Sequence, residues 1–290
     1  MIIMMKRIKR FVSWILGRHP INHVQVNVQS IAINELLKDR CAIVTGGTSG
    51  IGFSIAKAFL NSGASVIITG RSQDRISKAL QSLGEDKPVF GFELDNTNVS
   101  SFEDIFLRMQ DAISKKGIKA IDILVNNAGV NFKGMPNADE DEYDKVMDTN
   151  LKGAFFLSQM FGKYLVSNGI KGNILNIASA SSLRPADSAY ILSKWGLRGL
   201  TLGLAKALGK DGVTVNGIAP GPTATPMMIK EENPNMSLER IPLGRYIMPE
   251  EVANMAVFLV SGMGRSVMGD IVYMTGGAGV LTYDDVKYGF

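Results

Sequence analysis

A glycine-rich turn stands between a short apolar run and a helix-like stretch near the start of this chain. Residues 45–52 read Thr-Gly-Gly-Thr-Ser-Gly-Ile-Gly, follow the apolar run 41–44 and lead into residues 53–60. A buried strand that turns through glycines directly into a helix directs free backbone N–H groups and the positive end of the helix dipole at one point. The turn therefore predicts a pyrophosphate cradle, formed by Gly46, Thr48, Ser49, Gly50, Ile51 and Gly52.

Short apolar runs alternate with amphipathic stretches along the rest of the chain. We expect strands at residues 41–45, 65–69, 88–94, 121–125, 173–177, 213–218 and 271–274, with helices between them. Continuous apolar strands that alternate with helices are typical of a parallel sheet covered on both faces. The pattern predicts one doubly wound α/β domain of the Rossmann type, with a seven-stranded sheet in the order 3-2-1-4-5-6-7 and ligands at the carboxyl ends of the strands.

The basic character of the chain is concentrated in its first 20 residues. These contain five Lys or Arg residues and no acid, so the remainder holds 26 basic against 27 acidic residues. We therefore divide the chain into an arm, residues 1–37, and an enzyme-like domain, residues 38–290. The domain has no basic stripe of the kind that binds nucleic acid. A single cysteine, Cys41, allows neither a disulfide framework nor a cysteine metal site within one chain, which favours the cytoplasm.

The arm carries an amphipathic pattern over residues 4–16. Ile8, Phe11, Val12 and Ile15 recur at helical spacing, whereas the basic residues fall mostly elsewhere on the helical wheel. Such a segment can lie on an anionic membrane surface as a peripheral contact, and it can equally pack on the domain or on a partner subunit. No stretch of the chain approaches the roughly 20 apolar residues of a membrane span.

Tyr190 and Lys194 are spaced to lie one turn apart on the same face of a helix. Free tyrosine titrates near pH ~10, and a neighbouring ammonium favours the phenolate and lowers that pKa. The pair is therefore a candidate general acid and base, with Lys194 tuning Tyr190. The alternative is a surface lysine beside a core tyrosine.

Taken together with the glycine pattern GxxxGxG, the motifs of this chain resemble the classical short-chain dehydrogenase/reductase family from about residue 38 to 277. They occur in the family's order: Asp95 after a strand, Asn126 to Gly129, Asn150, Ser179, Tyr190 with Lys194, and Pro220 to Thr223. The resemblance is strongest to the branch of 3-oxoacyl-carrier-protein reductases and sugar or polyol dehydrogenases. It implies a metal-free hydride transfer between a nicotinamide dinucleotide and a carbonyl or alcohol.

The resemblance also assigns roles to individual residues. It implies that Tyr190 moves the proton, that Lys194 also binds the nicotinamide ribose, and that Asn150 bends a helix and holds a water for proton relay; an asparagine without such a role is the alternative. The remaining residues that it implies in cofactor binding are Asp95, Asn127, Ala128, Gly129, Pro220, Gly221 and Thr223. Part of the asparagine motif can also be structural, since the side chain can tie neighbouring strands together.

The catalytic serine is less clearly marked than the tyrosine. Family members usually carry it about 13 residues before the tyrosine, but here that position is Ile177 and Ser179 is 11 residues before. We place a two-residue shortening in the loop 180–187 and expect Ser179 to stabilise charge on the substrate oxygen. Ser181 and Ser182 remain competitors.

The cofactor preference is marked at the end of the second strand. An enzyme that prefers NAD usually places Asp or Glu there to bind the ribose 2′-hydroxyl, whereas this chain has Gly70 followed by Arg71. A guanidinium can pair with a 2′-phosphate and stack on adenine, with Ser72 and Arg75 in support. We predict NADP(H), with NAD(H) as the less favoured cofactor; a solvated arginine at a helix start is the alternative.

The expected activity is therefore an NADP(H)-dependent oxidoreductase acting on a small carbonyl or alcohol. Met227 and Met228 fall where the family has its substrate lid, and Arg184 falls at the mouth, where it meets an anionic substrate or only solvent. One rival is a non-catalytic nucleotide-sensing protein on the same fold, and another is a lyase or epimerase of the extended branch, whose glycine pattern differs. The family's pairing habit predicts a homotetramer or dimer.

Overall fold

The computed structural model describes residues 33–84, 86–228 and 236–279 of the 290-residue chain. The chain divides into two units, residues 1–31 and 32–290, and the first lies outside the described residues together with the predicted amphipathic segment 4–16. The second unit begins before the expected boundary at residue 38. Leu37 is fully buried in the core, and its N–H donates to Ser62 O at 2.8 Å.

The second unit is built on one parallel sheet of seven strands in the order β3-β2-β1-β4-β5-β6-β7. The strands are β1 (Cys41–Val44), β2 (Ser65–Gly70), β3 (Val89–Glu93), β4 (Ile123–Asn126), β5 (Asn173–Ile177), β6 (Thr214–Pro220) and β7 (Ile271–Met274). The predicted fold class, strand order and strand positions are confirmed. The order changes direction at β1, which pairs with β2 on one side and β4 on the other, so a crevice opens at the carboxyl ends of these strands.

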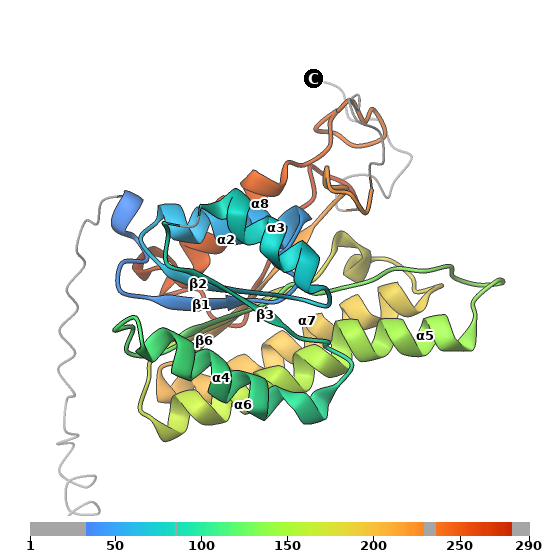
Figure 1. The fold of residues 1–290 in the computed structure, drawn as a ribbon. Helices are drawn as coiled ribbons and strands as arrows, with labels where there is room; N and C mark the ends of the chain where they lie inside the picture. The colour runs from blue at the N-terminus through green and yellow to red at the C-terminus, as the bar shows by residue number, and fades with distance from the viewer. Residues whose placement is uncertain (1–32, 85, 229–235, 280–290) are drawn as a thin grey trace, which may run out of the picture. The chain divides into compact units, whose positions relative to one another are not determined.

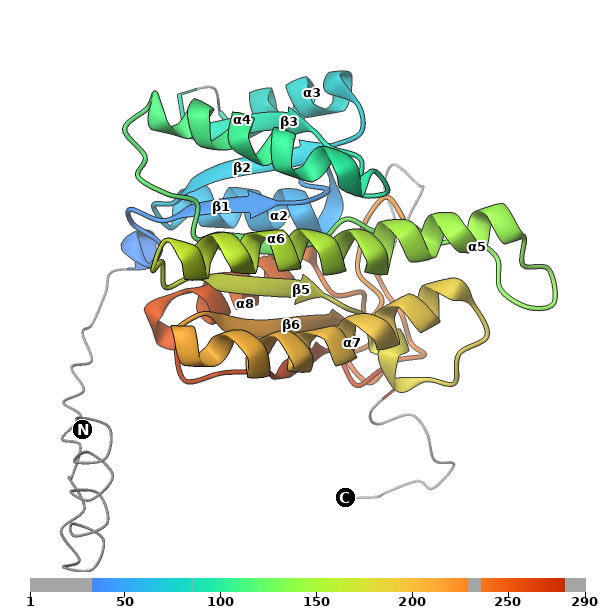
Figure 2. The same ribbon diagram turned by 90° about the horizontal axis from the view of Figure 1, so that it is seen from below.

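Helices cover both faces of the sheet (Figures 1 and 2). The helices are α2 (Gly50–Asn61), α3 (Gln73–Leu83), α4 (Phe102–Ser114), α5 (Glu140–Met147), α6 (Gly153–Ser167), α7 (Ala189–Leu208) and α8 (Pro249–Val260). One apolar core lies between the sheet and α2, α3 and α8, and a second lies between the sheet and α4, α6 and α7. The central strands are buried on both sides, which explains why they read as continuous apolar runs.

A polar ladder inside the second core fixes β4 and β5 to the helices that carry the candidate site. Asn126 Nδ2 donates to Ser158 Oγ on α6 and to Asn176 Oδ1 on β5, both at 2.8 Å. Asn176 Nδ2 in turn donates to Thr201 Oγ1 on α7 at 2.9 Å. Because buried polar groups are costly unless they are paired, this ladder fixes the position of α7 against the sheet.

Candidate active site

The glycine turn connects β1 to α2 and leaves its first helical N–H groups available. Gly46 has φ of +62°, and a Cβ there would lie 3.0 Å from Ala128 Cα, so only glycine lets the two loops approach. Ser49 caps α2 without a side-chain hydrogen bond. The first-turn N–H groups are therefore open toward an anion.

Asn127 and Thr45 hold this turn against the loop after β4. Asn127 Nδ2 donates to Thr45 O at 2.8 Å and to Gly46 O at 3.2 Å. Thr45 Oγ1 accepts from the N–H groups of Asn127 and Ala128, both at 3.0 Å. The asparagine side chain is thus occupied by the protein, and the backbone of the turn faces the cleft.

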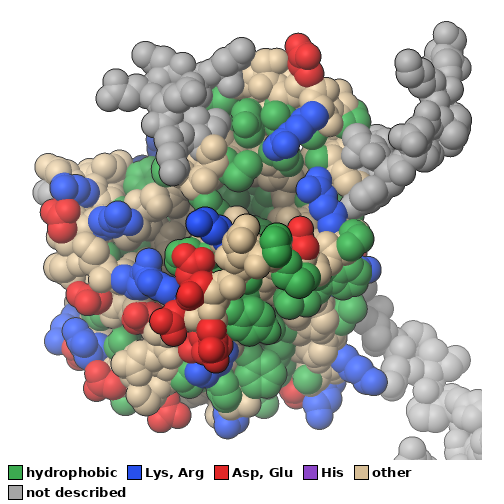
Figure 3. Space-filling view, turned by 90° about the vertical axis from the view of Figure 1, so that its right-hand side faces the viewer, with side chains coloured by type: hydrophobic (Ala, Val, Ile, Leu, Met, Phe, Trp, Pro, Cys, Tyr) green, Lys and Arg blue, Asp and Glu red, His purple; other side chains and the backbone are tan. Residues whose placement is uncertain are grey.

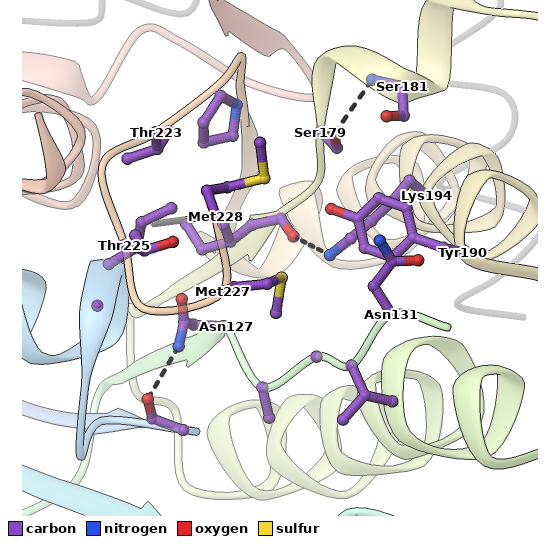
Figure 4. A pocket seen from close by; sticks show the side chains of 18 of the residues that line it. Asn127, Asn131, Ser179, Ser181, Tyr190, Lys194, Thr223, Thr225, Met227 and Met228 are labelled. Atoms are coloured by element: carbon purple, nitrogen blue, oxygen red, sulfur yellow. Dashed lines mark hydrogen bonds between the residues drawn. The ribbon is translucent and has the colours of Figure 1, made fainter. Parts of the chain in front are cut away.

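Tyr190, Lys194 and Ser179 meet at the carboxyl end of β5. Ser188 caps α7, which places Tyr190 and Lys194 on one face of the helix. Lys194 Nζ lies 5.5 Å from the centroid of the Tyr190 ring and donates to Ile177 O at 2.8 Å. In Figure 4 the Ser179 side chain lies on the side of the cleft toward which the Tyr190 hydroxyl points. Figure 4 shows these side chains converging on the cleft.

Burial decides the ionisation of both α7 groups. It raises the pKa of Tyr190 above its ordinary value, and the nearby Ser179 hydroxyl offsets part of that rise. Burial also lowers the pKa of Lys194 to about 8. The sequence predicted a lowered tyrosine pKa, but in this structure the loss of solvation raises it, so the phenol holds its proton at neutral pH.

Ser179 is also distinguished from the two serines that follow it. The N–H of Ser181 donates to Ser179 Oγ at 3.1 Å, and Ser182 Oγ donates to Ser179 O at 2.8 Å. Ser182 is fully buried. Both neighbours thus support the position of Ser179, whose hydroxyl is the one next to the phenol.

Asn150 lies behind the site and not in the cleft lining. It is 1% exposed and sits in a π-helical turn, Asp148–Lys152. Its Oδ1 accepts from Val130 N–H at 2.8 Å, and its Nδ2 donates to Val130 O at 2.9 Å and to Ser193 Oγ at 3.1 Å. Ser193 Oγ in turn donates to Tyr190 O at 2.7 Å, so Asn150 links the loop after β4 to the tyrosine helix.

A cleft of about 1080 Å³ runs across the carboxyl ends of the strands. Figure 3 looks onto this side of the molecule, where hydrophobic, basic and acidic side chains lie around a hollow. The cleft lining includes most of the predicted residues: Gly46, Thr48, Ser49, Gly50, Ile51, Arg71, Asn127, Ala128, Gly129, Ser179, Tyr190, Lys194, Pro220, Gly221 and Thr223. Gly52 packs beneath the turn against Asn127 and does not line the cleft.

Asp95 is turned away from the cleft. Its Oδ1 accepts from the N–H and the hydroxyl of Thr97, both at 2.9 Å, and the cleft is lined instead by its neighbours Leu94 and Asn96. The local turn after β3 satisfies the carboxylate, which explains its direction.

The end of β2 presents cations and no acid to the cleft. Gly70, Arg71, Ser72 and Arg75 all line it, and Thr48 lies so close to Gly70 that a Cβ there would be 2.9 Å from Thr48 Cγ2. Arg71 and Arg75 are exposed, and neither takes part in the ion pairs among the described residues.

The segment after β6 crosses over the glycine turn. Thr223 is buried and its Oγ1 donates to Gly221 O at 2.9 Å. Thr225 lies against Gly50, where an added Cβ would meet its Cγ2 at 3.3 Å. Met227 and Met228 are about half exposed and, in Figure 4, lie between this segment and Tyr190.

Several lining residues were not identified from the sequence. They are Thr149, Asn131, Phe132, Met135, Arg240 and Ile241, together with backbone around Ile177. Asn131 and Phe132 directly follow the asparagine motif, which is the one local signal that marks them. Arg240 belongs to an irregular stretch that no motif covers.

The cleft fits a dinucleotide on two structural grounds. Free N–H groups at the start of α2 suit a pyrophosphate, and their glycines leave no room for a Cβ against the loop after β4. Thr149 Oγ1 is a buried hydroxyl in the cleft lining without a partner among the described residues. Such a group needs a hydrogen-bond partner, which a polar ligand can supply.

Comparison with known proteins agrees with this geometry. Residues 46–279 match the family model described as enoyl-(acyl carrier protein) reductase. A 3alpha-hydroxysteroid dehydrogenase from Mediterraneibacter gnavus is 36% identical, with 84% of this chain and 98% of that protein covered. A 3-oxoacyl-[acyl-carrier-protein] reductase from Chlamydia muridarum is 34% identical, over 84% of this chain and 99% of that protein.

A solved structure shows the same architecture. A short-chain dehydrogenase from Burkholderia cenocepacia in complex with NADP superimposes with a TM-score of 0.72 at 29% identity, covering 83% of this chain and 98% of that one. The glycine turn, the Ser179, Tyr190 and Lys194 group, the family match and the curated relatives lead to one conclusion. The chain belongs to the classical short-chain dehydrogenase/reductase family of oxidoreductases.

Proposed function

We propose that this chain is an NADP(H)-dependent oxidoreductase that interconverts a small carbonyl compound and its alcohol. The observation that carries the proposal is the meeting of Tyr190, Ser179 and Lys194 in the same cleft as the open glycine turn. A protein that only senses a nucleotide has no need of this group. The reductases and dehydrogenases among its relatives support the same class of reaction.

Ser179, Tyr190 and Lys194 have different roles in the proposed reaction. When bound, the dinucleotide would supply or accept the hydride at the substrate carbon. Ser179 donates to the substrate oxygen and stabilises the charge that grows there. Tyr190 gives its proton to that oxygen in reduction and takes it back in oxidation. Lys194 stabilises the phenolate left after proton transfer, because a cation beside an anion lowers its free energy most where water is excluded.

The backbone around the site keeps these groups in place. Asn150 fixes Val130 on one side and α7, through Ser193, on the other. We also propose that Asn150, in its π-helical turn, holds a water molecule that relays protons between Lys194 and bulk solvent. Because the pKa of Tyr190 is raised, its phenol is protonated at neutral pH, which is the form that carbonyl reduction requires.

The cofactor preference is proposed from the end of β2. Arg71, Ser72 and Arg75 line the cleft there, and the strand ends in Gly70 where a carboxylate would repel a 2′-phosphate. Gly46, Ser49 and Gly50 would hold the pyrophosphate, and Gly221 and Thr223 would border the nicotinamide. The related structure with NADP bound supports this choice.

We also propose a dimer or tetramer. Large apolar side chains on α6 and α7 are 37% to 53% exposed in the isolated chain: Phe155, Phe156, Leu192, Trp195 and Leu202. An apolar face of this kind is typical of a surface covered by a partner, here a second copy. Among the described residues no helix is long and apolar enough to cross a membrane. A cytoplasmic location and a peripheral membrane contact through residues 4–16 remain predictions.

The test is a panel of ketones, aldehydes, sugars, polyols and hydroxy acids with both cofactors, followed at the nicotinamide absorbance band. We expect turnover of at least one carbonyl with NADPH and a higher kcat/KM with NADPH than with NADH. Binding of both cofactors without turnover of any compound would favour the sensing protein. Truncation before Ala32 serves as a control, since the compact unit starts there and should keep its activity.

A further inference from the structure

The charged side chains of the cleft are unevenly distributed. Its lining contains five cations, Arg71, Arg75, Arg184, Lys194 and Arg240, and one acid, Asp187. Arg71 and Arg75 follow β2, which is separated from β5 by β1 and β4, or about 14 Å at the usual strand spacing. They serve the adenosine end, and Lys194 serves the phenol. Arg184 and Arg240 have no role in the proposed hydride transfer.

Arg184 is held in place by its backbone. It follows Ser179 in the loop after β5, and its N–H donates to Ser181 O at 3.0 Å. Its carbonyl accepts from Trp195 Nε1 on α7 at 2.9 Å. The backbone is thus fixed on both sides, while the guanidinium is exposed and takes no part in the ion pairs among the described residues.

Arg240 reaches the cleft from a different wall. The next residue, Ile241, is 4% exposed, and its carbonyl accepts from Gly244 N–H at 2.9 Å. Leu243 N–H donates to Gly276 O at 3.0 Å, which ties this turn to the chain after β7. Arg240 therefore belongs to the β5–β7 side of the cleft, like Arg184 and away from Arg71. It is likewise exposed and without an ion pair in the described part of the chain.

Among the described residues, no acidic group forms an ion pair with either of these two arginines. Asp187 lines the cleft, but its carboxylate is not within 4.0 Å of either guanidinium. The acids at the start of α5, from Asp139 to Glu142, lie outside the cleft lining. The cleft lining also contains the apolar side chains of Ile191, Met227 and Met228, and Figure 4 shows both methionines beside Tyr190.

We propose, on the basis of the oxidoreductase function above, that the substrate is an oxo acid or hydroxy acid with an apolar body. Its carboxylate, remote from the reacting carbon, binds Arg184 and Arg240, and its apolar body lies against the methionines. Guanidinium groups pair well with carboxylates, and thioethers adapt to apolar shapes. The arginines are specificity residues and take no part in proton or hydride transfer.

The test compares a linear keto acid, in which several methylenes separate ketone and carboxylate, with its methyl ester. The full-length chain should prefer the acid through a lower KM. Arg184→Gln and Arg240→Gln should each reduce the acid-to-ester ratio of kcat/KM by up to about tenfold, a modest loss because both side chains are exposed. Arg184→Lys should restore part of the ratio, and added salt should lower it.

A matched control is Arg265→Gln, since Arg265 is exposed but outside the cleft lining. Its acid-to-ester ratio should equal that of the wild type. Equal kcat/KM for acid and ester in the wild type, or equal losses for both in the arginine variants, would overturn the inference while leaving the oxidoreductase proposal intact.

A second readout needs no turnover. The ligand for calorimetry is the linear fatty acid of the same chain length as the keto acid but without the ketone, which cannot be reduced. In the presence of NADPH, its binding should weaken in Arg184→Gln and Arg240→Gln but not in Arg265→Gln. If no compound is turned over, this arginine-dependent binding still supports an acidic ligand and places the failure with the oxidoreductase proposal. Binding of the acid that is the same in all variants would refute the carboxylate site.

Discussion

The two ends of the same sheet differ in whether their charged side chains have partners within the protein. At the amino end, Arg40 donates to Asp122, to Asn173 Oδ1 at 2.7 Å and to Val260 O at 3.2 Å, and Cys41 N–H donates to Asp122 Oδ1 at 2.9 Å. At the carboxyl end, Lys194 is buried without a carboxylate, and the arginines of the cleft have no ion-pair partner among the described residues.

This difference separates stability from function. A charge whose partners are all supplied by the protein ties elements together: here β1, β4, β5 and the end of α8. A buried or unpaired charge costs free energy and is kept where a ligand or a reaction needs it. Changes at the amino end should therefore affect unfolding, and changes at the carboxyl end should affect turnover.

The largest effect is expected from Tyr190→Phe. The ring is kept but the proton donor is lost, so turnover should fall about 100- to 10,000-fold. The free energy of unfolding and the affinity for NADPH should change little. Steady-state kinetics and fluorescence titration of NADPH measure the two effects. Tyr143→Phe, at a partly exposed position on α5 outside the cleft, is the control. A Tyr190→Phe enzyme that keeps a tenth of its activity would contradict the assignment.

Ser179→Ala should come next, with a loss of at least about 100-fold in kcat, the scale of one donor to a developing oxyanion. Ser181→Ala should cost much less, because Ser181 contacts Ser179 through its backbone N–H, which the substitution retains. The two variants are compared in kcat under saturating cofactor. The reverse order of losses would move the catalytic role to Ser181.

Asp122→Asn at the amino end should lower the free energy of unfolding by about 2 kcal/mol, since a hydrogen-bonded charge is lost beside Arg40. Its kcat per folded molecule should equal that of the wild type. Urea unfolding measures the first and kinetics the second. Asp111→Asn, in an exposed pair with Lys115, is the matched control and should cost below about 0.5 kcal/mol. A lower kcat per folded molecule in Asp122→Asn would contradict the inference that the amino end contributes to stability and not to turnover.

Arg71→Ala tests the cofactor end of the cleft. Loss of a charge-assisted contact costs about 1.5 to 3 kcal/mol of binding free energy, which corresponds to NADPH binding about 10- to 150-fold more weakly. The affinity for NADH should be nearly unaffected. Lys78→Ala on α3, exposed and outside the cleft, is the control. Equal losses for both cofactors, or a wild type that prefers NADH, would count against a 2′-phosphate site.

Much of this arrangement was readable from the sequence because it depends on local patterns. The strands, the glycine turn and the spacing of Tyr190 and Lys194 each follow from residues near one another in the chain. The unpredicted parts depend on tertiary packing. The link from Asn150 to Val130 and Ser193 joins three separate elements. The direction of Asp95 is an exception, because it follows from a local turn with Thr97 that the sequence reading did not consider.

The degree of burial was also beyond the sequence. The Tyr190 and Lys194 spacing correctly suggests proximity, but it does not tell how far the surrounding helices and β5 exclude water. That exclusion raises the tyrosine pKa where a lowered one was expected. Arg240 was missed for a similar reason, since its turn reaches the cleft only by packing on the chain after β7.

The smallest expected effect is the pH dependence of the carboxyl-end site. Burial lowers the pKa of Lys194 to about 8, so its ammonium is present at pH 7 and is lost as the pH rises through that value. The pKa of Tyr190 is raised, so the phenol stays protonated over the same range. If the reduction needs the ammonium, kcat/KM should fall by about tenfold between pH 7 and pH 9, because this parameter reports groups of the free enzyme. Lys194→Arg, whose charge persists above pH 12, should have lower activity but no decline over this range. A wild-type profile that is flat to pH 9 would show that the charge of Lys194 is not needed, and a decline that persists in Lys194→Arg would assign it to another group.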